Sequence, residues 1–226
     1  MREALFDLSD EYDAMLNRGI SLSGENRAYF IAGRIRDLKA QLPVARLPRR
    51  ILDFGCGAGE TTEQLLTHFQ GAEVVGIDTS ENALKAATRR YGSGRVRFQT
   101  IDEFRGREDF DVCYVNGVFH HIEPPDRSAA LQIIYRSLAP GGYLALFENN
   151  PWNPGARLVM HRIPFDRDAR PLSPIETKRL LGTAGFRGLT VRSLFYFPRP
   201  LSWLRFLEPF LVRLPLGAQY YVLAVK

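Results

Sequence analysis

The chain has 226 residues, of which 45% are apolar, and its charged residues are 30 basic and 25 acidic ones. This composition excludes a globally disordered protein, and the length suits a single domain that buries a substantial core. The two cysteines cannot form a disulfide framework, and the four histidines have no spacing typical of zinc ligands. We therefore expect no metal site and a reducing, cytoplasmic setting.

The net charge of +5 is unevenly distributed along the chain. Residues 1–150 contain 18 basic and 21 acidic residues, whereas residues 151–226 contain 12 basic and 4 acidic ones. A basic C-terminal third suits an anionic partner, although solvated surface arginines explain it equally well. No motif typical of nucleic-acid readers is present, so we expect no nucleic-acid partner. The N-terminus does not resemble a signal peptide, and no run approaches the ~20 apolar residues of a membrane span.

Short apolar runs alternate with helical patterns in the middle of the chain. Strands are predicted over residues 50–54, 72–78, 95–100, 110–116 and 142–148, and helices over residues 60–69, 81–91 and 126–138. The runs are apolar on both sides of the pleat, as buried parallel strands require. This alternation predicts an α/β protein with a parallel sheet that helices cover on both faces.

The two ends of the chain depart from this alternation. Residues 3–40 suggest two helices, the second opened by Ser23, that pack over the sheet's edge or its ligand face. After residue 149 come a proline-rich segment, a helix over 174–184, an apolar run over 189–197 and a last strand over 219–225. We expect one domain, with capping helices in 1–45, a cofactor-binding core in 46–148 and substrate-side insertions with closing strands in 149–226.

A glycine-rich loop provides the strongest functional signal. The strand over 50–54 leads into the sequence GCGAG at 55–59, where glycines allow a tight turn and close approach of a ligand to the backbone. The following helix offers unpaired N–H groups. Asp78 ends the next strand, where a carboxylate can accept hydrogen bonds from ribose hydroxyls, and Asp53 can meet a cationic amino group. Glu60 stands where a dinucleotide motif needs glycine, so an adenosine with a zwitterionic tail is favoured over a nicotinamide dinucleotide.

Several segments resemble class I S-adenosylmethionine-dependent methyltransferases. Residues 52–59 resemble the first motif of that family, residues 75–80 its second-strand motif, residues 110–122 its fourth-strand motif and residues 138–144 its L-x-P-G-G turn. The resemblance implies a Rossmann-like, doubly wound, seven-stranded sheet that is mostly parallel with an antiparallel last strand. It also implies S-adenosylmethionine as cofactor and S-adenosylhomocysteine as product, with Asp102 placed to meet the adenine amino group. The expected cofactor residues are Asp53, Gly55, Cys56, Gly57, Gly59, Asp78, Thr79, Asp102 and Asn116.

Candidate catalytic and substrate-binding residues follow the fourth and fifth strands. Methyl transfer from a sulfonium depends mainly on positioning, but an acceptor oxygen or acidic carbon must also lose its proton. His121 and His120 are candidate bases, and Glu148 is a candidate to orient a histidine or bind a hydroxyl. Candidate substrate contacts are Tyr12, Asn149, Asn150 and Trp152.

The expected function is methyl transfer to a small-molecule acceptor, and the apolar C-terminal insertion motivates the hypothesis that this acceptor is apolar or lipid-linked. The amphipathic stretch 201–214 suits a lid, a dimer face or a peripheral membrane contact, so both a monomer and a homodimer stay open. Two alternatives share the glycine loop. One is a non-catalytic S-adenosylmethionine-binding regulator or scaffold, and the other is a nicotinamide-dependent reductase.

Overall fold

The computed structural model describes residues 19–44, 47–106, 109–163 and 169–226. Its centre is a seven-stranded sheet with strand order β3-β2-β1-β4-β5-β7-β6. The strands are β1 (Arg50–Phe54), β2 (Glu73–Asp78), β3 (Val96–Thr100), β4 (Phe110–Asn116), β5 (Leu138–Asn149), β6 (Arg187–Leu194) and β7 (Gln219–Val225). Only β7 runs antiparallel to its neighbours β5 and β6. The expected Rossmann-like sheet with an antiparallel last strand is confirmed.

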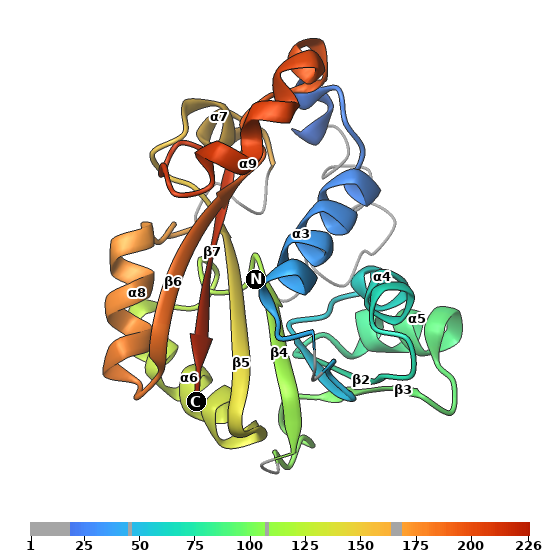
Figure 1. Ribbon diagram of the computed structural model, residues 1–226. Helices are drawn as coiled ribbons and strands as arrows, with labels where there is room; N and C mark the ends of the chain where they lie inside the picture. The colour runs from blue at the N-terminus through green and yellow to red at the C-terminus, as the bar shows by residue number, and fades with distance from the viewer. Residues whose placement is uncertain (1–18, 45–46, 107–108, 164–168) are drawn as a thin grey trace.

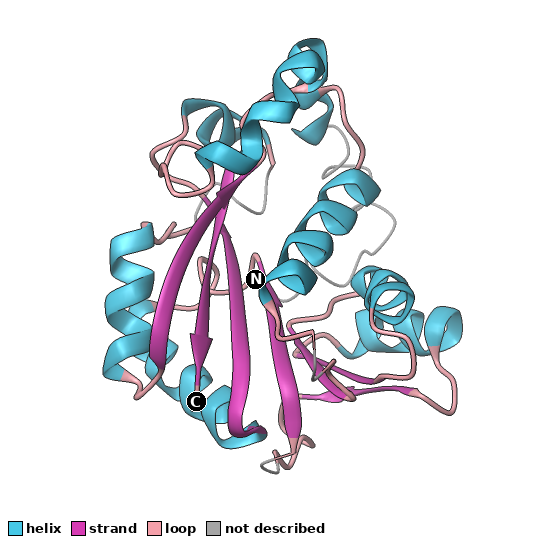
Figure 2. Ribbon diagram, in the orientation of Figure 1, coloured by secondary structure: helices cyan, strands magenta, loops and turns pink. Residues whose placement is uncertain are grey.

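Helices cover both faces of this sheet (Figures 1 and 2). On one face lie α3 (Arg27–Gln41), α4 (Glu60–His68) and α5 (Glu81–Tyr91), and on the other lie α6 (Arg127–Ser137) and α8 (Pro174–Thr183). The remaining helical elements are η1 (Ser21–Ser23), η2 (Pro124–Asp126), α7 (Pro154–Arg162), η4 (Arg199–Leu207) and α9 (Glu208–Leu211). Each face has its own core, because Ile35 and Leu65 pack in one cluster and Leu131 and Leu181 in another. None of the described helices has the length and apolar character needed to cross a bilayer.

Most predicted elements agree with the structure to within a few residues, but β5 is longer than expected. It begins at Leu138 rather than at residue 142 and includes the Pro-Gly-Gly turn. Phe110 of β4 pairs with Leu138, whereas Val112 pairs with Tyr143, so residues 139–142 form a bulge in the register. Gly141 has φ +76°, which a residue with a side chain rarely adopts.

The start of α3 corrects the prediction that Ser23 opens a helix. Asn26 is the N-cap, and its side chain accepts a hydrogen bond from the backbone N–H of Tyr29 at 2.9 Å. The Ser23 hydroxyl instead donates to the carbonyl of Ile20 at 2.7 Å and closes the short turn η1. The first of the two helices expected in residues 3–40 falls largely on residues 1–18, outside the described residues.

The C-terminal third differs from the prediction in two places. The predicted apolar run 189–197 extends past β6, which ends at Leu194 because Phe195 has φ +63°. The stretch 201–214 is not one amphipathic helix but the 3₁₀ segment η4 followed by the single turn α9, with Pro209 in its first turn. Side chains three residues apart eclipse one another in a 3₁₀ helix, so Trp203 and Phe206 lie on the same side.

Candidate functional site

A cavity of about 1310 Å³ opens at the carboxyl ends of β1, β2 and β4. The glycine loop after β1, the loop after β4, and side chains from α3 and α7 all contribute to its walls. In an open parallel sheet, ligands bind in this position beyond the strand ends. The volume exceeds the roughly 300–1,000 Å³ of an ordinary ligand pocket, so the cavity has room for a cofactor and an acceptor together.

The glycine loop exposes its backbone to this cavity. Gly55 has φ +75° and Gly57 has φ +52°, and both line the cavity. A Cβ on Gly57 would meet no described atom within 4 Å, so it would project into open space, whereas a Cβ on Gly55 would lie 2.3 Å from Cγ2 of Val118. A ligand can therefore approach the backbone most closely at Gly57.

Asp53 supplies a buried carboxylate at the base of the loop. Its side chain is 2% exposed and lines the cavity, and its Oδ2 has no hydrogen-bond partner among the described residues. Burial, together with the nearby Asp78 carboxylate, raises the pKa of Asp53 to about 7, and the Arg34 guanidinium opposes this increase. A cationic group such as the amino group of S-adenosylmethionine would give this carboxylate the partner that it lacks.

Other predicted cofactor residues lie beside the loop. The two oxygens of the Asp78 carboxylate accept the backbone N–H groups of Gly57 at 2.8 Å and Ser80 at 3.0 Å, and Asp78, Thr79 and Asn116 all line the cavity. Each carboxylate oxygen can accept a second hydrogen bond, so Asp78 retains capacity for ribose hydroxyls. Burial and the nearby Asp53 raise the pKa of the Cys56 thiol well above its usual value, which keeps it protonated.

Two predicted cofactor residues do not line the cavity. Gly59 is the N-cap of α4 with φ +78°, and a Cβ there would lie 3.0 Å from Ala87 and Phe98, so its role is to let the helix pack. The Asp102 side chain is exposed, while the neighbouring Ile101 lines the cavity. The turn after β3 thus directs Asp102 toward solvent, and the geometry gives no support to a contact between Asp102 and adenine.

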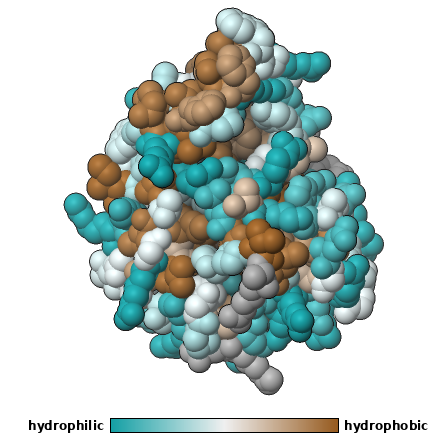
Figure 3. All heavy atoms as spheres, in the orientation of Figure 1, coloured by the Kyte–Doolittle hydropathy of each residue, from teal (hydrophilic) through white to brown (hydrophobic). Residues whose placement is uncertain are grey.

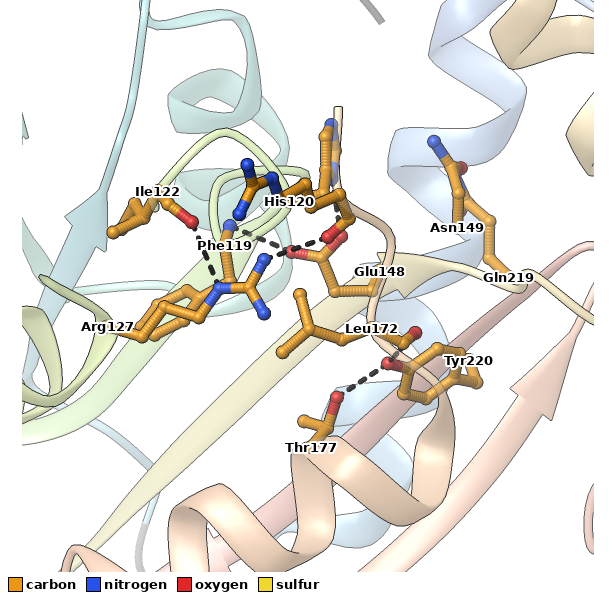
Figure 4. Close-up of polar contacts among 11 residues, drawn as sticks. Phe119, His120, Ile122, Arg127, Glu148, Asn149, Leu172, Thr177, Gln219 and Tyr220 are labelled. Atoms are coloured by element: carbon orange, nitrogen blue, oxygen red, sulfur yellow. Dashed lines mark hydrogen bonds and ion pairs between the residues drawn. The ribbon is translucent and has the colours of Figure 1, made fainter. Parts of the chain in front are cut away.

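His120 and Glu148 form a buried pair at the wall of the cavity (Figure 4). Glu148 Oε2 lies 2.5 Å from Nδ1 of His120, and Glu148 Oε1 accepts the backbone N–H of Phe119 at 2.9 Å. His120 lines the cavity and is 4% exposed, whereas Glu148 is buried behind it. Glu148 therefore orients His120 and is not itself a wall residue. His121 also lines the cavity, with its ring centroid 4.1 Å from that of His120.

The loop that carries the two histidines is anchored to α6 and to residues 170–172. Arg127 of α6 donates to the carbonyls of Ile122 at 3.0 Å and Arg170 at 2.8 Å, and the backbone N–H of Arg170 donates to the carbonyl of His120 at 2.9 Å. Below this loop, the Tyr220 hydroxyl donates to the carbonyl of Leu172 at 2.7 Å (Figure 4). These contacts fix the direction of the His120 ring.

The substrate residues predicted after β5 separate into two groups. Asn149 lines the cavity, and its Oδ1 accepts a hydrogen bond from Gln219 at 3.1 Å. Asn150 is fully buried, and its amide bonds the carbonyls of Pro215 and Gly217 and the backbone N–H of Trp152, so it fixes a turn rather than contacting the cavity. Trp152 is 45% exposed and does not line the cavity. Tyr12 lies outside the described residues.

Sequence reasoning missed a cationic residue in the wall. Arg34 of α3 is 5% exposed and lines the cavity. Its Nε donates to the Tyr114 hydroxyl and its Nη1 donates to Oε1 of Gln219, both at 2.9 Å. Both hydrogen-bond partners are neutral, and the charge of Arg34, which lowers the pKa of Asp53, can also attract a ligand anion in the cavity. The place of Arg34 in the cavity wall was not predictable from the sequence, because its hydrogen-bond partners lie 80 and 185 residues away along the chain.

Known proteins resemble this chain in sequence. A family model described as a methyltransferase domain matches residues 52–144. Trans-aconitate 2-methyltransferase of Rhodopseudomonas palustris (strain BisB5) is 31% identical over 135 residues, which cover 60% of this chain and 52% of that protein. The matched segment thus spans about half the length of that relative. Trans-aconitate 2-methyltransferase of Variovorax paradoxus (strain S110) is 30% identical over 213 residues, 84% of this chain and 82% of that protein.

Solved structures share the fold. A methyltransferase from Archaeoglobus fulgidus superposes with a TM-score of 0.67 at 18% identity, over 89% of this chain and 95% of that one. A possible histamine N-methyltransferase from Thermotoga maritima gives a TM-score of 0.69 at 21% identity over the whole of both chains. Taken with the glycine loop and the strand order, the match over 82% of the Variovorax relative shows that the chain belongs to the class I S-adenosylmethionine-dependent methyltransferases.

Proposed function

We propose that this protein transfers the methyl group of S-adenosylmethionine to an oxygen atom of a small molecule with a largely apolar body. The observation that carries the proposal is the His120–Glu148 pair, because it lies in the wall of the same cavity as the glycine loop. S-adenosylmethionine, when bound, supplies a methyl group already activated on sulfur. The protein then has to bind both molecules, align them, exclude water and remove a proton from the acceptor.

The two parts of the cavity suit these two ligands. Gly57, Asp53 and Asp78 would hold the cofactor through its amino and ribose groups, as argued above. Elsewhere the walls are mainly apolar and aromatic, with Tyr29, Phe30, Val118, Ile133, Val159 and Phe195 among them. Such walls favour an acceptor with an apolar body and keep water away from the reacting atoms.

His120 is the proposed base. When its Nδ1–H donates to Glu148, Nε2 is the basic atom of the ring and can take the proton of an acceptor hydroxyl. The Glu148 carboxylate then stabilises the imidazolium that forms. This assignment favours His120 over His121, because it is the His120 ring whose Nδ1 lies 2.5 Å from the Glu148 carboxylate.

A carboxylate acceptor is a second candidate, and Arg34 favours it. The two relatives above are named trans-aconitate 2-methyltransferases, and aconitate is a carboxylate. A buried guanidinium with two neutral partners suits recognition of an anionic acceptor. A carboxylate needs no base, so this reaction would use Arg34 and leave His120 unnecessary.

One labelling experiment separates the candidates. Methyl-labelled S-adenosylmethionine is incubated with the protein and a fractionated bacterial extract, and the label is followed into organic-soluble and aqueous pools. Label released by mild alkali indicates a methyl ester, whereas label that resists alkali excludes the ester and is expected for the ether formed on a hydroxyl acceptor. An absence of label in every pool, together with confirmed binding of S-adenosylhomocysteine, would support the binding-protein alternative instead.

Variants assign the base. His120→Gln is expected to reduce the rate of ether formation by about 10²–10⁴-fold, with the melting-temperature increase from S-adenosylhomocysteine unchanged. His161→Gln is the matched control, because His161 is an exposed histidine of α7 outside the cavity wall, and it should keep the full rate. A His120→Gln protein that keeps its rate within about twofold would remove His120 from the mechanism, since that change is far below the range expected for a lost base.

A further inference from the structure

Large apolar side chains gather on one end of the molecule without a cover among the described residues. Trp203 is 69% exposed, Phe206 67% and Phe210 82%. Leu201, Leu214 and Leu216 belong to the same segment, and together these six residues are half of the twelve exposed large apolar side chains in the described part of the chain. Figure 3 shows hydrophobic residues gathered at the end where Figure 1 places α9. We call these six residues the apolar end.

Hydrogen bonds hold the apolar end in a defined shape. The Tyr196 hydroxyl lies 2.5 Å from the carbonyls of Leu211 and Leu214. The Asn153 side chain donates to the carbonyl of Leu216 at 2.7 Å, which places α7 next to this surface. Because the 3₁₀ geometry of η4 eclipses Trp203 and Phe206, these two rings project together. The exposed rings are therefore presented by an anchored segment.

The charge around the apolar end is positive. Residues 150–163 and 197–217 contain five arginines, namely Arg157, Arg162, Arg199, Arg205 and Arg213, and one acidic residue, Glu208. Glu208 faces inward, where its carboxylate accepts the backbone N–H groups of Tyr196 and Phe197 at 3.1 Å. Arg205 pairs with Glu25 at 2.8 Å. The other four arginines are exposed and lie on the segments that carry the apolar end or on the adjoining α7, so these segments present cations together with aromatic and aliphatic side chains.

This combination matches an anionic lipid surface better than a second copy of the chain. A two-fold interface would place two copies of the same net positive surface against each other, and these surfaces would repel. Anionic lipid headgroups complement these arginines, and tryptophan and phenylalanine insert readily at the boundary between headgroups and acyl chains.

The apolar end also borders the cavity. Phe197, Pro198 and Arg205, next to or within η4, line the cavity, as do Leu158 and Val159 of α7. A compound dissolved in the bilayer would therefore meet the cavity where the protein meets the lipid.

We propose that the apolar end binds the surface of an anionic lipid bilayer and that the methyl acceptor enters the cavity from it. The entry route rests on the proposed function, which requires an apolar acceptor, whereas the lipid contact does not depend on it.

The test is co-sedimentation of the full chain with vesicles of phosphatidylcholine alone or mixed with phosphatidylglycerol. Binding is expected only with the anionic mixture, and it should weaken at high salt. The double variant Trp203→Ser/Phe206→Ser should bind at least about tenfold more weakly, because two exposed rings no longer enter the membrane. The control Val44→Ser/Ile175→Ser replaces two exposed apolar residues elsewhere and should bind like the unchanged protein. S-adenosylhomocysteine should raise the melting temperature of every variant, which shows that each one folds.

Two results would overturn the proposal: absence of binding to the anionic vesicles, or equal binding by the Trp203→Ser/Phe206→Ser variant. A third such result would come from sedimentation velocity. If the protein does not bind vesicles but forms a dimer that the Trp203→Ser/Phe206→Ser variant abolishes, the apolar end binds a second copy of the chain. Vesicle binding is measured without turnover, so a failure of the proposed acceptor chemistry leaves this result intact. Faster methylation of an extracted acceptor in anionic vesicles than in detergent would support the entry route, and an equal rate in both would contradict it.

Discussion

At the scale of single residues, a substitution at Gly57 tests the proposed ligand binding by the glycine loop separately from the contribution of the loop to the fold. Gly57→Ala places a methyl group in the space that a ligand would occupy, and it destabilises the fold by about 1–2 kcal/mol because φ is +52°. We expect this variant to fold but to lose the melting-temperature increase from S-adenosylhomocysteine. Gly55→Val is a poorer test, since its side chain would also collide with Val118.

Gly71→Ala is the matched control for this experiment. Gly71 has φ +84° and no described atom within 4 Å of its Cβ position, but it lies in the turn before β2, outside the cavity wall. It should show a similar loss of stability and a full response to S-adenosylhomocysteine. If both variants respond equally, the cofactor does not lie against Gly57.

Asp53 should make the stability of the ligand-free protein decrease as the pH rises. Its pKa increases from 3.8 in the unfolded chain to about 7 in the folded protein, which corresponds to about 4 kcal/mol. Between these two pH values the folded state holds a proton that the unfolded state has lost. The stability linked to Asp53 is therefore lost as the pH rises from about 4 to 7, and it stays low above pH 7.

Asp53→Asn removes this titration. In urea unfolding, the gain in stability of Asp53→Asn over the unchanged protein should be larger at pH 8 than at pH 5 by about 3 kcal/mol. The same variant should bind S-adenosylmethionine more weakly, because the cationic amino group loses its counter-charge. A gain that does not change between the two pH values would show that Asp53 titrates normally.

The sequence predicted the cavity wall better around the glycine loop than after β4 and β5. Gly57 and Asp78 are recognisable because a loop and a strand end define their positions locally. The pairing of His120 with Glu148 joins positions 28 residues apart, and the choice between His120 and His121 depends on the turn after β4. The burial of Asn150 was not predictable for a similar reason, since the carbonyls that accept hydrogen bonds from its side-chain amide lie 65 and 67 residues away along the chain.

At the scale of elements, α3 forms a wall of the cavity and is tied to the sheet by one ion pair. Asp37 accepts hydrogen bonds from Nε and Nη2 of Arg192 at 2.8 and 2.7 Å, and from the Tyr221 hydroxyl at 2.6 Å. Burial and the adjacent carboxylate raise the pKa of Tyr221, so it stays protonated and donates. Bidentate geometry makes this pair stronger than an ordinary surface salt bridge.

Asp37→Ala should destabilise the fold by about 2–3 kcal/mol, because it leaves both Arg192 and Tyr221 without their acceptor. Urea unfolding measures the loss. The double variant Asp37→Ala/Arg192→Met should recover part of it, since no partly buried cation is then left unpaired. If Asp37→Ala costs less than about 0.5 kcal/mol, the packing of Ile35 and Leu38 holds α3 in place without the ion pair.

Elements were predictable where apolar runs end at clear signals. The bounds of β1, β4, β7 and α5 match the prediction, because each is an apolar or amphipathic run with polar residues, glycine or a capping serine at its ends. The start of α3 was not predictable from the sequence, since serine and asparagine both commonly cap helices. The choice between Ser23 and Asn26 depends on how α3 packs. The stretch 201–214 has a helical apolar pattern, but three prolines at 198, 200 and 209 favour short turns.

At the scale of the whole molecule, the two cysteines lie in different parts of the structure, one in the core and one at the cavity. Cys113 is 0% exposed in the middle of β4, within the core under α6. Cys56 is 9% exposed and belongs to the glycine loop at the cavity. Burial raises the pKa of both thiols, so neither is reactive in the closed native state. Local opening of the loop would be enough to expose Cys56, whereas exposure of Cys113 requires the sheet to come apart.

Labelling with a thiol reagent under native conditions should therefore show two phases. The fast phase should disappear in Cys56→Ala and become slower with S-adenosylhomocysteine, because the ligand holds the loop closed. The slow phase should disappear in Cys113→Ala and follow the rate of global unfolding measured in urea. If both thiols instead react in a single phase, and the ligand slows both equally, the loop opens only when the whole sheet unfolds. The cavity would then belong to one cooperative unfolding unit together with both cores.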